Sequence, residues 1–258
     1  MQLEQSLLEI AGVLIIITVL GYTAWLDWKY RRVNNKIWIY PAGGSLVILL
    51  ARTYLNSEYL LFFFISVGVT FLLVFILFSI GVFGGADGKA LLSISLVLPI
   101  APNLIGDLQT LPIFAISTFN NMLVLLAVSS ILLLVWNIGT AKPIYNPFEG
   151  FEKEKSWRRV LTSLTCYRIP VSKIIGKKHI QVREVIRDND LYLKTFRRIE
   201  CENETNLELI ESYKKEKGLQ LKVWVSSPIP LILFVLIAFI MTVVLGDIIL
   251  MMFSFVFA

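Results

Sequence analysis

The sequence is poor in charge and in the side chains that bind metal ions or form nucleophile–base pairs. Charged residues make up 17% of the chain, whereas soluble globular proteins average about 25%. The single histidine, His179, excludes an HExxH zinc site, because that motif needs two histidines one helical turn apart. Neither a G-x-S-x-G nucleophile elbow nor a Walker A phosphate loop occurs. The two cysteines, Cys166 and Cys201, match no zinc spacing.

Long apolar runs stand where charge is missing. Hydrophobic residues make up 56% of the chain, and the mean hydropathy is +0.72. The uncharged stretches are Ile10–Leu26, Ile37–Ala51, Tyr59–Gly81, Ala90–Gly106, Leu108–Ala141 and Val223–Gly246. About 20 apolar residues span the ~30 Å hydrocarbon layer. We therefore expect six transmembrane helices; the second and fourth are short, but leaving one out would reverse the topology.

The basic residues predict which connections face the cytoplasm. With the N-terminus outside, residues 27–36, 82–89 and 142–222 lie inside and hold 23 of the 24 basic residues, leaving only Arg52 outside. The positive-inside rule favours this orientation, with both termini outside. The net charge of +5 then reflects topology and attraction to anionic membrane lipid. No nucleic-acid partner is expected.

The expected fold class is an all-α membrane bundle of six transmembrane helices, with a small α+β cytoplasmic domain between helices 5 and 6. We place the boundaries at 1–141 for the first five helices, 142–222 for the soluble domain and 223–258 for the last helix and tail. Alternation in Ile180–Ile186 and Leu191–Ile199 predicts short strands. Thr205-x-x-Glu208 predicts a helix start, and Gly218 predicts its end.

Two aspartates are the candidate chemical groups. The acidic residues outside the soluble domain are Glu4, Glu9, Asp27, Glu58, Asp87, Asp107 and Asp247. Solvation accounts for the four in outside connections, and Asp247 is expected to cap the last span. Asp27 and Asp87 instead lie at the cytoplasmic ends of two spans, so they share one depth and can meet, and ionisable residues at membrane depth are candidates for function.

Each aspartate also has a purely structural interpretation. Asp27 could end the first helix with Arg31 as its partner, and Asp87 could be a helix N-cap. The glycines around Asp87 favour a functional interpretation, because glycine allows another chain to approach closely. Two carboxylates held close together share one proton, so that one serves as a base and the other as an acid. Such a pair needs no cofactor and no metal.

Two segments resemble a known family. Residues 84–89, Gly-Gly-Ala-Asp-Gly-Lys, resemble the GxGD signature of membrane aspartyl proteases, with Ala86 in place of a glycine. The segment after Asp27 is similar to the D-x-x-x-R-x-I-P-N motif of type IV prepilin peptidases, and the matching residues are Arg31, Val33 and Asn35. Asn34 stands where proline is usual. The layout resembles the archaeal branch, the preflagellin (archaellin) peptidases.

The resemblance implies an aspartic endopeptidase. It would remove a short basic leader from preflagellin or type IV pilin-like precursors at the cytoplasmic face. Asp27 and Asp87 would be catalytic. The implied substrate- or loop-shaping residues are Gly84, Gly85, Ala86, Gly88, Lys89 and Arg31. If leader recognition is electrostatic, the better candidates are Glu149, Glu152 and Glu154, although such an acidic-basic run is more often a solvated surface.

Two other functions fit some of these features. A presenilin- or signal-peptide-peptidase-like protease would also use two aspartates, but it has a Tyr-Asp motif where Leu26 precedes Asp27 here. A proton- or cation-coupled transporter could use the same carboxylates, but transporters typically bind near the bilayer midplane.

The charge pattern makes a prediction about topology. A reporter fused after Lys89 or inside residues 142–222 should report a cytoplasmic location, and one fused after Arg52 an external location. Alkaline phosphatase and green fluorescent protein fusions measure this. An external signal after Lys89 would contradict both the span count and the shared depth of the two aspartates.

Overall fold

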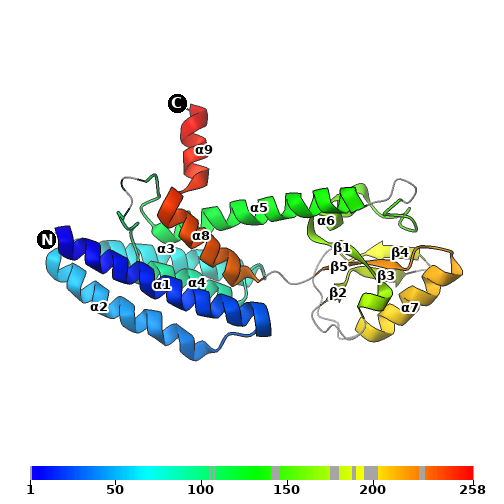
Figure 1. Cartoon of the computed structure of the whole chain (residues 1–258), viewed down its shortest axis with the longest axis horizontal. Coiled ribbons are helices and arrows are strands. Elements are labelled where there is room, and N and C mark those ends of the chain that lie inside the picture. Colours follow the sequence, from blue (N-terminus) through cyan, green and yellow to red (C-terminus); the bar gives the residue numbers. More distant parts are fainter. Residues whose placement is uncertain are drawn as a thin grey trace. The chain divides into compact units, whose positions relative to one another are not determined.

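The computed structural model describes residues 2–104, 106, 108–140, 146–174, 180–187, 190–194, 203–226 and 230–257. The chain forms two compact units (Figure 1). One comprises Met1–Leu126 with Pro230–Ala258, and the other comprises Ala127–Ile229.

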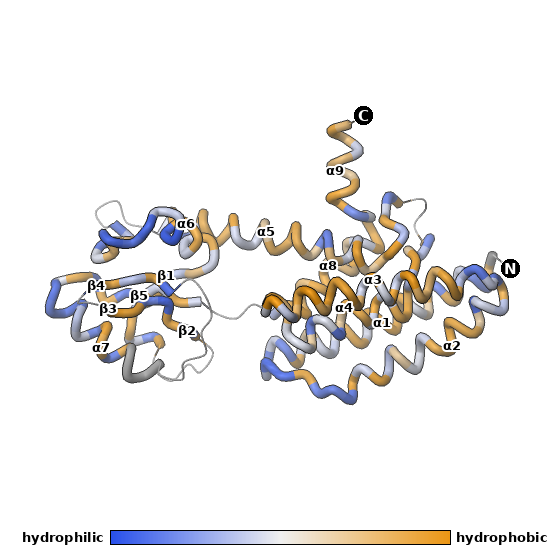
Figure 2. Tube along the Cα trace, turned by 180° about the vertical axis from the view of Figure 1, so that it is seen from behind, coloured by the Kyte–Doolittle hydropathy of each residue, from blue (hydrophilic) through white to orange (hydrophobic). Residues whose placement is uncertain are grey.

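The first unit is helical, as the apolar runs predict. Its elements are α1 (Gln2–Tyr30), the 3-10 helix η1 (Asn35–Trp38), α2 (Ile39–Leu55), α3 (Tyr59–Ser79), α4 (Gly85–Val97), the start of α5 (Phe114–Thr140), α8 (Leu231–Leu245) and α9 (Ile248–Phe257). Hydrophobic residues predominate along most of these helices (Figure 2). Many of their large side chains are exposed, and Phe64 and Leu72 on α3 are examples. An apolar exterior of this kind is typical of a membrane protein.

Within the described parts of the chain, three helices are long and apolar enough to cross a membrane: Leu3–Tyr30, Tyr59–Ser79 and Phe114–Thr140. The pair α8 and α9, bent by 47°, makes a fourth if it is one span. Helix α2 has 17 residues and α4 has 13, and at 1.5 Å per residue α4 is only about 20 Å long. The count of six spans therefore stays a prediction.

Short α4 is the central helix of this unit. It packs against α1, α2, α3 and α8, and its buried residues are Gly88, Ala90, Leu91, Ser93, Ile94, Ser95 and Val97. Four of these seven are small, which lets neighbouring backbones approach closely, as is common between membrane helices. The tightest approach is at Gly88, where an added Cβ would lie 2.5 Å from Cγ1 of Val74 on α3.

Polar side chains join the ends of the helices that lie away from Asp87. Glu9 of α1 forms an ion pair of 2.9 Å with Arg52 of α2 and accepts a hydrogen bond from the backbone N–H of Asn103. The guanidinium of Arg52 also lies over the ring of Tyr59. Solvation was the expectation for Glu9, and it is wrong, because the side chain of Glu9 is only 14% exposed.

The break between α8 and α9 depends on a second polar cluster. Gly246 has a φ of +85°, and Asp247 is fully buried. Asp247 accepts hydrogen bonds from Asn120 and from the backbone N–H of Leu250, so it caps the start of α9. Asn121 donates to the carbonyl of Gly246 and accepts from the N–H of Ile248. The expected capping role of Asp247 is found, but the capped helix is the one that follows it.

The second unit combines strands and helices. Its elements are α6 (Ser156–Thr165), β1 (Tyr167–Pro170), η2 (Val171–Lys173), β2 (Gln181–Val182), β3 (Glu184–Arg187), β4 (Asp190–Leu193), α7 (Asn203–Glu216) and β5 (Lys222–Ser226). The strands form an antiparallel sheet in the order β1-β5-β2 and a β3-β4 pair. Buried Glu184 and Lys214 form an ion pair of 2.6 Å that ties β3 to α7.

Local sequence signals predicted part of this unit well. The expected strands are found at 181–187 and 190–193, while residues 195–199 lie outside the described residues. Helix α7 ends as predicted: Gly218 has a φ of +65°, and the N–H of Leu219 bonds to the carbonyl of Lys214. This is the Schellman pattern that glycine favours.

The last apolar run is divided between two elements. Residues 223–226 pair with β1 and β2 as part of β5, and α8 begins only at Leu231. The chain passes from one compact unit to the other at residues 126–127 and 229–230. The charge-based domain boundaries at 141 and 222 stay a prediction. An uncharged β-branched sequence such as Val223–Val225 suits a buried strand as well as a helix.

The contact at Gly88 makes a prediction about packing. Gly88→Ala should lower the free energy of unfolding by about 1–3 kcal/mol, because the methyl group overpacks the α3–α4 interface. Adding Val74→Ala should restore most of the loss. Gly85→Ala is the matched control, since an added Cβ there meets no atom within 4 Å. Thermal unfolding in detergent measures these effects, and a Gly88→Ala variant as stable as the control would contradict the contact.

Candidate active site

Asp27 lies in the last turn of α1 and is half-buried. The beginning of α8 is next to it, and the backbone N–H of Ile232, in the first turn of α8, acts on its carboxylate as a hydrogen-bond donor. The first N–H groups of a helix have no partner inside the helix and favour negative charge. The positive charge of Arg31 acts on the same carboxylate. Burial disfavours the ionised form of Asp27 most strongly, and these two groups partly offset that effect.

Arg31 ends α1 with an unusual backbone conformation. Its φ of +54° is the one positive value at a non-glycine residue in the part of the chain that the structure describes. The N–H of Arg31 bonds to the carbonyl of Asp27 at 3.1 Å, which is the left-handed helix ending that glycine usually provides. A non-glycine residue in this region costs about 1 kcal/mol. The turn directs the chain away from Asp27 into η1.

Asp87 lies in the first turn of α4. Gly84 is the N-cap residue, and its backbone N–H donates to Oδ2 of Asp87 at 2.9 Å. The expected N-cap role therefore belongs to Gly84, while Asp87 reaches back to it from the third helical position. A Cβ on Gly84 would lie 3.0 Å from Oδ2, whereas one on Gly85 would meet nothing within 4 Å. Gly84 thus gives room to the carboxylate.

The structure places the two predicted aspartates close enough for the charge of Asp27 to act on Asp87. Helices α1, α4 and α8 pack together, which places the end of α1 beside the first turns of the other two. Burial raises the pKa of Asp87 to about 6, the N–H of Gly84 opposes the rise, and the negative charge of Asp27 adds to it. Asp87 therefore holds a proton in a pH range where an ordinary aspartate has lost it.

Lys89 connects the two sequence motifs directly. Its Nζ donates a 2.7 Å hydrogen bond to Oδ1 of Asn35, a residue 54 positions earlier. Asn34 begins η1 by accepting from the N–H of Lys36, so it has a local structural role where proline is usual. Val33 and Ala86 both pack against the hydrophobic core of the unit. The methyl group of Ala86 is thus accommodated by packing.

Two groups near the aspartates, the Asn35 side chain and the N–H of Ile232, were not among the site residues predicted from the sequence. Asn35 matched the motif, but its partner could not be seen without the fold. The N–H of Ile232 is a backbone group in an apolar run and has no sequence signal. Arg31 acts on Asp27, and Gly84 bonds Asp87. The roles predicted for Arg31, Lys89 and the glycines in catalysis stay predictions.

The acidic run after α5 is only partly available for binding a leader. Glu154 is buried, accepts a hydrogen bond from the N–H of Leu193 and pairs with Arg158. Glu152 accepts from the N–H of Gly150. Glu154 therefore stabilises the second unit, which leaves Glu149 and Glu152 as the exposed carboxylates of this run.

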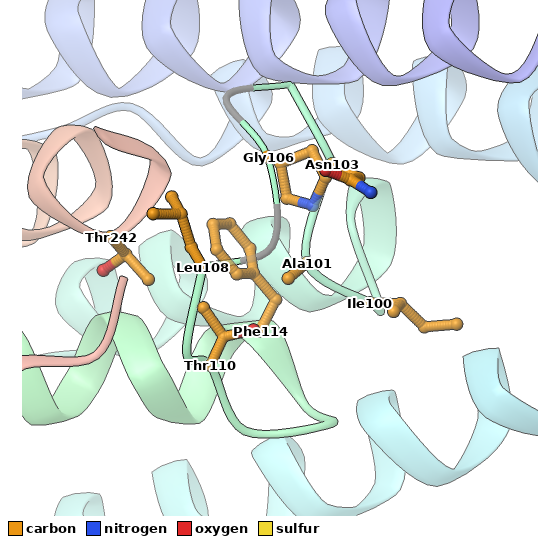
Figure 3. A pocket seen from close by; sticks show the side chains of 9 residues that line it. Ile100, Ala101, Asn103, Gly106, Leu108, Thr110, Phe114 and Thr242 are labelled. Atoms are coloured by element: carbon orange, nitrogen blue, oxygen red, sulfur yellow. The ribbon is translucent and has the colours of Figure 1, made fainter. Parts of the chain in front are cut away.

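A cavity in the first unit lies away from both aspartates. It has a volume of about 240 Å³, and Figure 3 shows the side chains of Ala101, Leu108 and Phe114 around it. Thr242, near the end of α8, also lines it. Because the cavity follows the C-terminal end of α4 and Asp87 lies in the first turn, about 15 Å of helix separates them. It is not part of the candidate active site.

Comparison with known proteins agrees with the motifs. A family model described as "Type IV leader peptidase family" matches residues 14–138, which include both aspartates. A second model, "Archaeal Peptidase A24 C-terminus Type II", matches residues 158–248. The chain belongs to the type IV leader peptidase family, a family of membrane proteases, and has the C-terminal region of its archaeal members.

A curated relative points to a particular branch of that family. The chain is 27% identical over 233 residues to the preflagellin peptidase of Methanococcus voltae. The match covers 86% of this chain and 89% of the relative. It therefore extends through the helical unit and the strand-containing unit alike.

The charge coupling predicts how Asp87 titrates. Asp27→Asn removes the negative charge that raises the pKa of Asp87, so the midpoint should move below 6. Asp247→Asn should leave it in place, because Asp247 lies beyond the far end of α8. Infrared difference spectroscopy of the carboxyl group against pH measures the midpoint in the full chain. An unchanged midpoint in Asp27→Asn would show that the carboxylates do not interact.

The same raised pKa has a consequence for stability. A carboxyl whose pKa is higher in the folded chain favours folding when protonated. This contribution is fully present below the unfolded pKa of about 4, and it is lost as pH rises through about 6.

Proposed function

We propose that this protein is a membrane aspartyl endopeptidase that removes short basic leaders from preflagellin- or pilin-like precursors at the cytoplasmic face. The observation that supports the proposal is the effect of the Asp27 charge on Asp87, because the two residues come from different helices that pack together. Family membership and the name of the curated relative support the same substrate class.

The surroundings of the two carboxylates suggest a division of labour. Asp27, beside Arg31 and the N-terminus of α8, is the base that takes a proton from water. The resulting hydroxide attacks the scissile carbonyl carbon, and Asp87 gives its proton to the carbonyl oxygen. When the intermediate collapses, the C–N bond breaks, the new amine takes the proton held by Asp27, and Asp87 regains a proton from a hydroxyl of the intermediate as the carboxyl product forms. The raised pKa of Asp87 suits the role of acid near pH 6.

Aromatic residues near Asp27 support a position at the membrane surface. Tyr22 stacks on Trp25, which contacts Tyr30 edge-on, and Lys29 lies over both Trp25 and Tyr30. Tryptophan and tyrosine favour the boundary between hydrocarbon and water. A bond between a water-exposed basic leader and a membrane-held segment lies at this depth. The cytoplasmic side itself rests on the charge pattern.

Positions at helix ends favour proteolysis over transport. Asp27 and Asp87 lie in terminal turns, whereas transporters place their sites at interrupted helices near the midplane. The interrupted helix pair, α8 and α9, breaks at Gly246, beyond the opposite end of α8 from Ile232.

Cleavage of a precursor by the purified protein tests whether Asp27 and Asp87 act as a catalytic pair. Asp27→Asn and Asp87→Asn should each lower kcat by about 1,000-fold or more, and the double variant should be no worse, because residues that act as a unit are non-additive. A gel-shift assay with an archaellin precursor measures cleavage. Unchanged thermal unfolding would show that the variants are folded.

Asp247→Asn is the matched control, since it makes the same change to a buried aspartate beyond the far end of α8. Asparagine retains the oxygen that caps α9, so this variant should keep activity. Normal cleavage by a clean preparation of Asp27→Asn would refute the pairing and leave Asp87 without a partner.

A further inference from the structure

A basic pocket in the second unit lies beside the last turn of α5. Its volume is about 220 Å³, and it is lined by Trp136, Asn137, Thr140, Pro147, Arg168 and Lys222. Two of these side chains are cations, and the described lining contains no carboxylate. Hydroxyl and amide groups together with two cations suit an anion that has several oxygens, such as a phosphate.

The two cations come from neighbouring strands. Arg168 on β1 is opposite Trp224 on β5, and Lys222 is two residues before Trp224, so Arg168 and Lys222 are diagonal neighbours on one face. The guanidinium of Arg168 is fixed over the ring of Trp224, with 5.8 Å to its centroid. The Nε of Arg168 is buried and has no hydrogen-bond partner among the described residues. A second contact holds this arginine in place, because its Nη2 donates a 3.5 Å hydrogen bond to Oε1 of Gln220.

Nearby negative charges do not remove the preference for an anion. Glu184 and Glu149 both act on the charge of Arg168. Glu184 is already bonded to Lys214 and to the backbone N–H of Trp224, and Glu149 is exposed to solvent. Neither carboxylate lines the pocket.

The second observation is an apolar face on α6 that is exposed at Trp157 and Val160 and half-buried at Leu161 and Leu164. Trp157, Val160, Leu161 and Leu164 have the i, i+3, i+4, i+7 spacing of one helix face. Trp157 and Val160 are 51% and 57% exposed. The opposite face is turned to the unit, because Thr162 is buried and Arg159 donates to the carbonyl of Phe151. A short amphipathic helix with tryptophan on its apolar side is typical of a membrane surface.

One side chain joins the pocket, α6 and the candidate membrane span. Nδ2 of Asn137, which lines the pocket, donates to the carbonyls of Ser163 and Cys166, at the end of α6 and just after it. Asn137 and Trp136 are near the end of the apolar helix Phe114–Thr140. Figure 1 shows α6 beside the end of α5. The pocket and the apolar face therefore both lie at the end of the candidate span α5.

We propose that this pocket binds the headgroup phosphate of an anionic phospholipid while the apolar face of α6 rests in the same leaflet. Arg168 and Lys222 contact the phosphate oxygens, and Trp136 lies at headgroup depth. The lipid fixes the second unit to the membrane surface. The proposal does not depend on the catalytic roles of Asp27 and Asp87.

Lipid binding by the full chain in detergent tests the pocket. Short-chain phosphatidylglycerol should bind more tightly than phosphatidylcholine, as measured by microscale thermophoresis. Lys222→Met and Arg168→Met should each weaken binding by about fivefold or more. Lys217→Met, which removes one exposed charge elsewhere in the unit, should leave Kd unchanged. Lys222 is exposed, so its variant remains informative if Arg168→Met fails to fold.

Three results would contradict the proposal that the pocket binds a lipid headgroup. Equal losses in Lys222→Met and Lys217→Met would show non-specific attraction. No loss in Lys222→Met would show that its side chain binds nothing there. Displacement of the lipid by inorganic phosphate at equal concentration would show a site for free phosphate.

A nitroxide label on α6 tests the apolar face. In a Cys201→Ser background, the label on Val160→Cys in phosphatidylglycerol liposomes should collide with oxygen and be shielded from a nickel chelate. The label on Ser212→Cys, an exposed position on α7, should behave in the opposite way. Equal nickel accessibility at the two positions would refute membrane contact by α6.

Discussion

Close packing of the short helix α4 is the constraint on which the helical unit depends. Gly88 lets α4 approach Val74 of α3 without a gap, and the small residues that follow let α1, α2 and α8 approach from other sides. Because α4 is central, its first turn lies where α1 ends and α8 begins. Two helix N-termini then supply N–H groups to two carboxylates, to Asp87 from Gly84 and to Asp27 from Ile232.

The polar side chains at the two ends of the helical unit differ in how they are paired and buried. Away from Asp87, Glu9 pairs with Arg52, and Asp247 and Asn121 accept or donate several hydrogen bonds. These contacts hold helices together in a setting where unpaired polar groups are costly. At the Asp27 end, the carboxylates remain half-buried and influence each other's charge. The first arrangement gives stability, and the second keeps protonation adjustable, which is what acid–base chemistry needs.

The second unit has its own anchor to the apolar part of the chain. Asn137 fastens the end of α5 to α6 and β1, and the buried ion pair between Glu184 and Lys214 joins the sheet to α7. Its exposed cations and apolar face both suit an anionic membrane surface. Binding to such a surface would give the basic residues of the second unit a role besides setting the orientation of the chain in the membrane.

The sequence by itself determined the membrane character, the helix ending at Gly218 and the presence of two aspartates at helix ends, because these depend on neighbours within a few residues. Only the tertiary structure decided that Lys89 bonds Asn35, that Glu9 pairs with Arg52 and that Glu154 is internal. It also assigned residues 223–226 to a strand, where apolar composition allowed either element. The reason is physical: hydrogen bonds and charge interactions depend on distances between groups remote in sequence, and those distances are fixed only when the helices and strands pack.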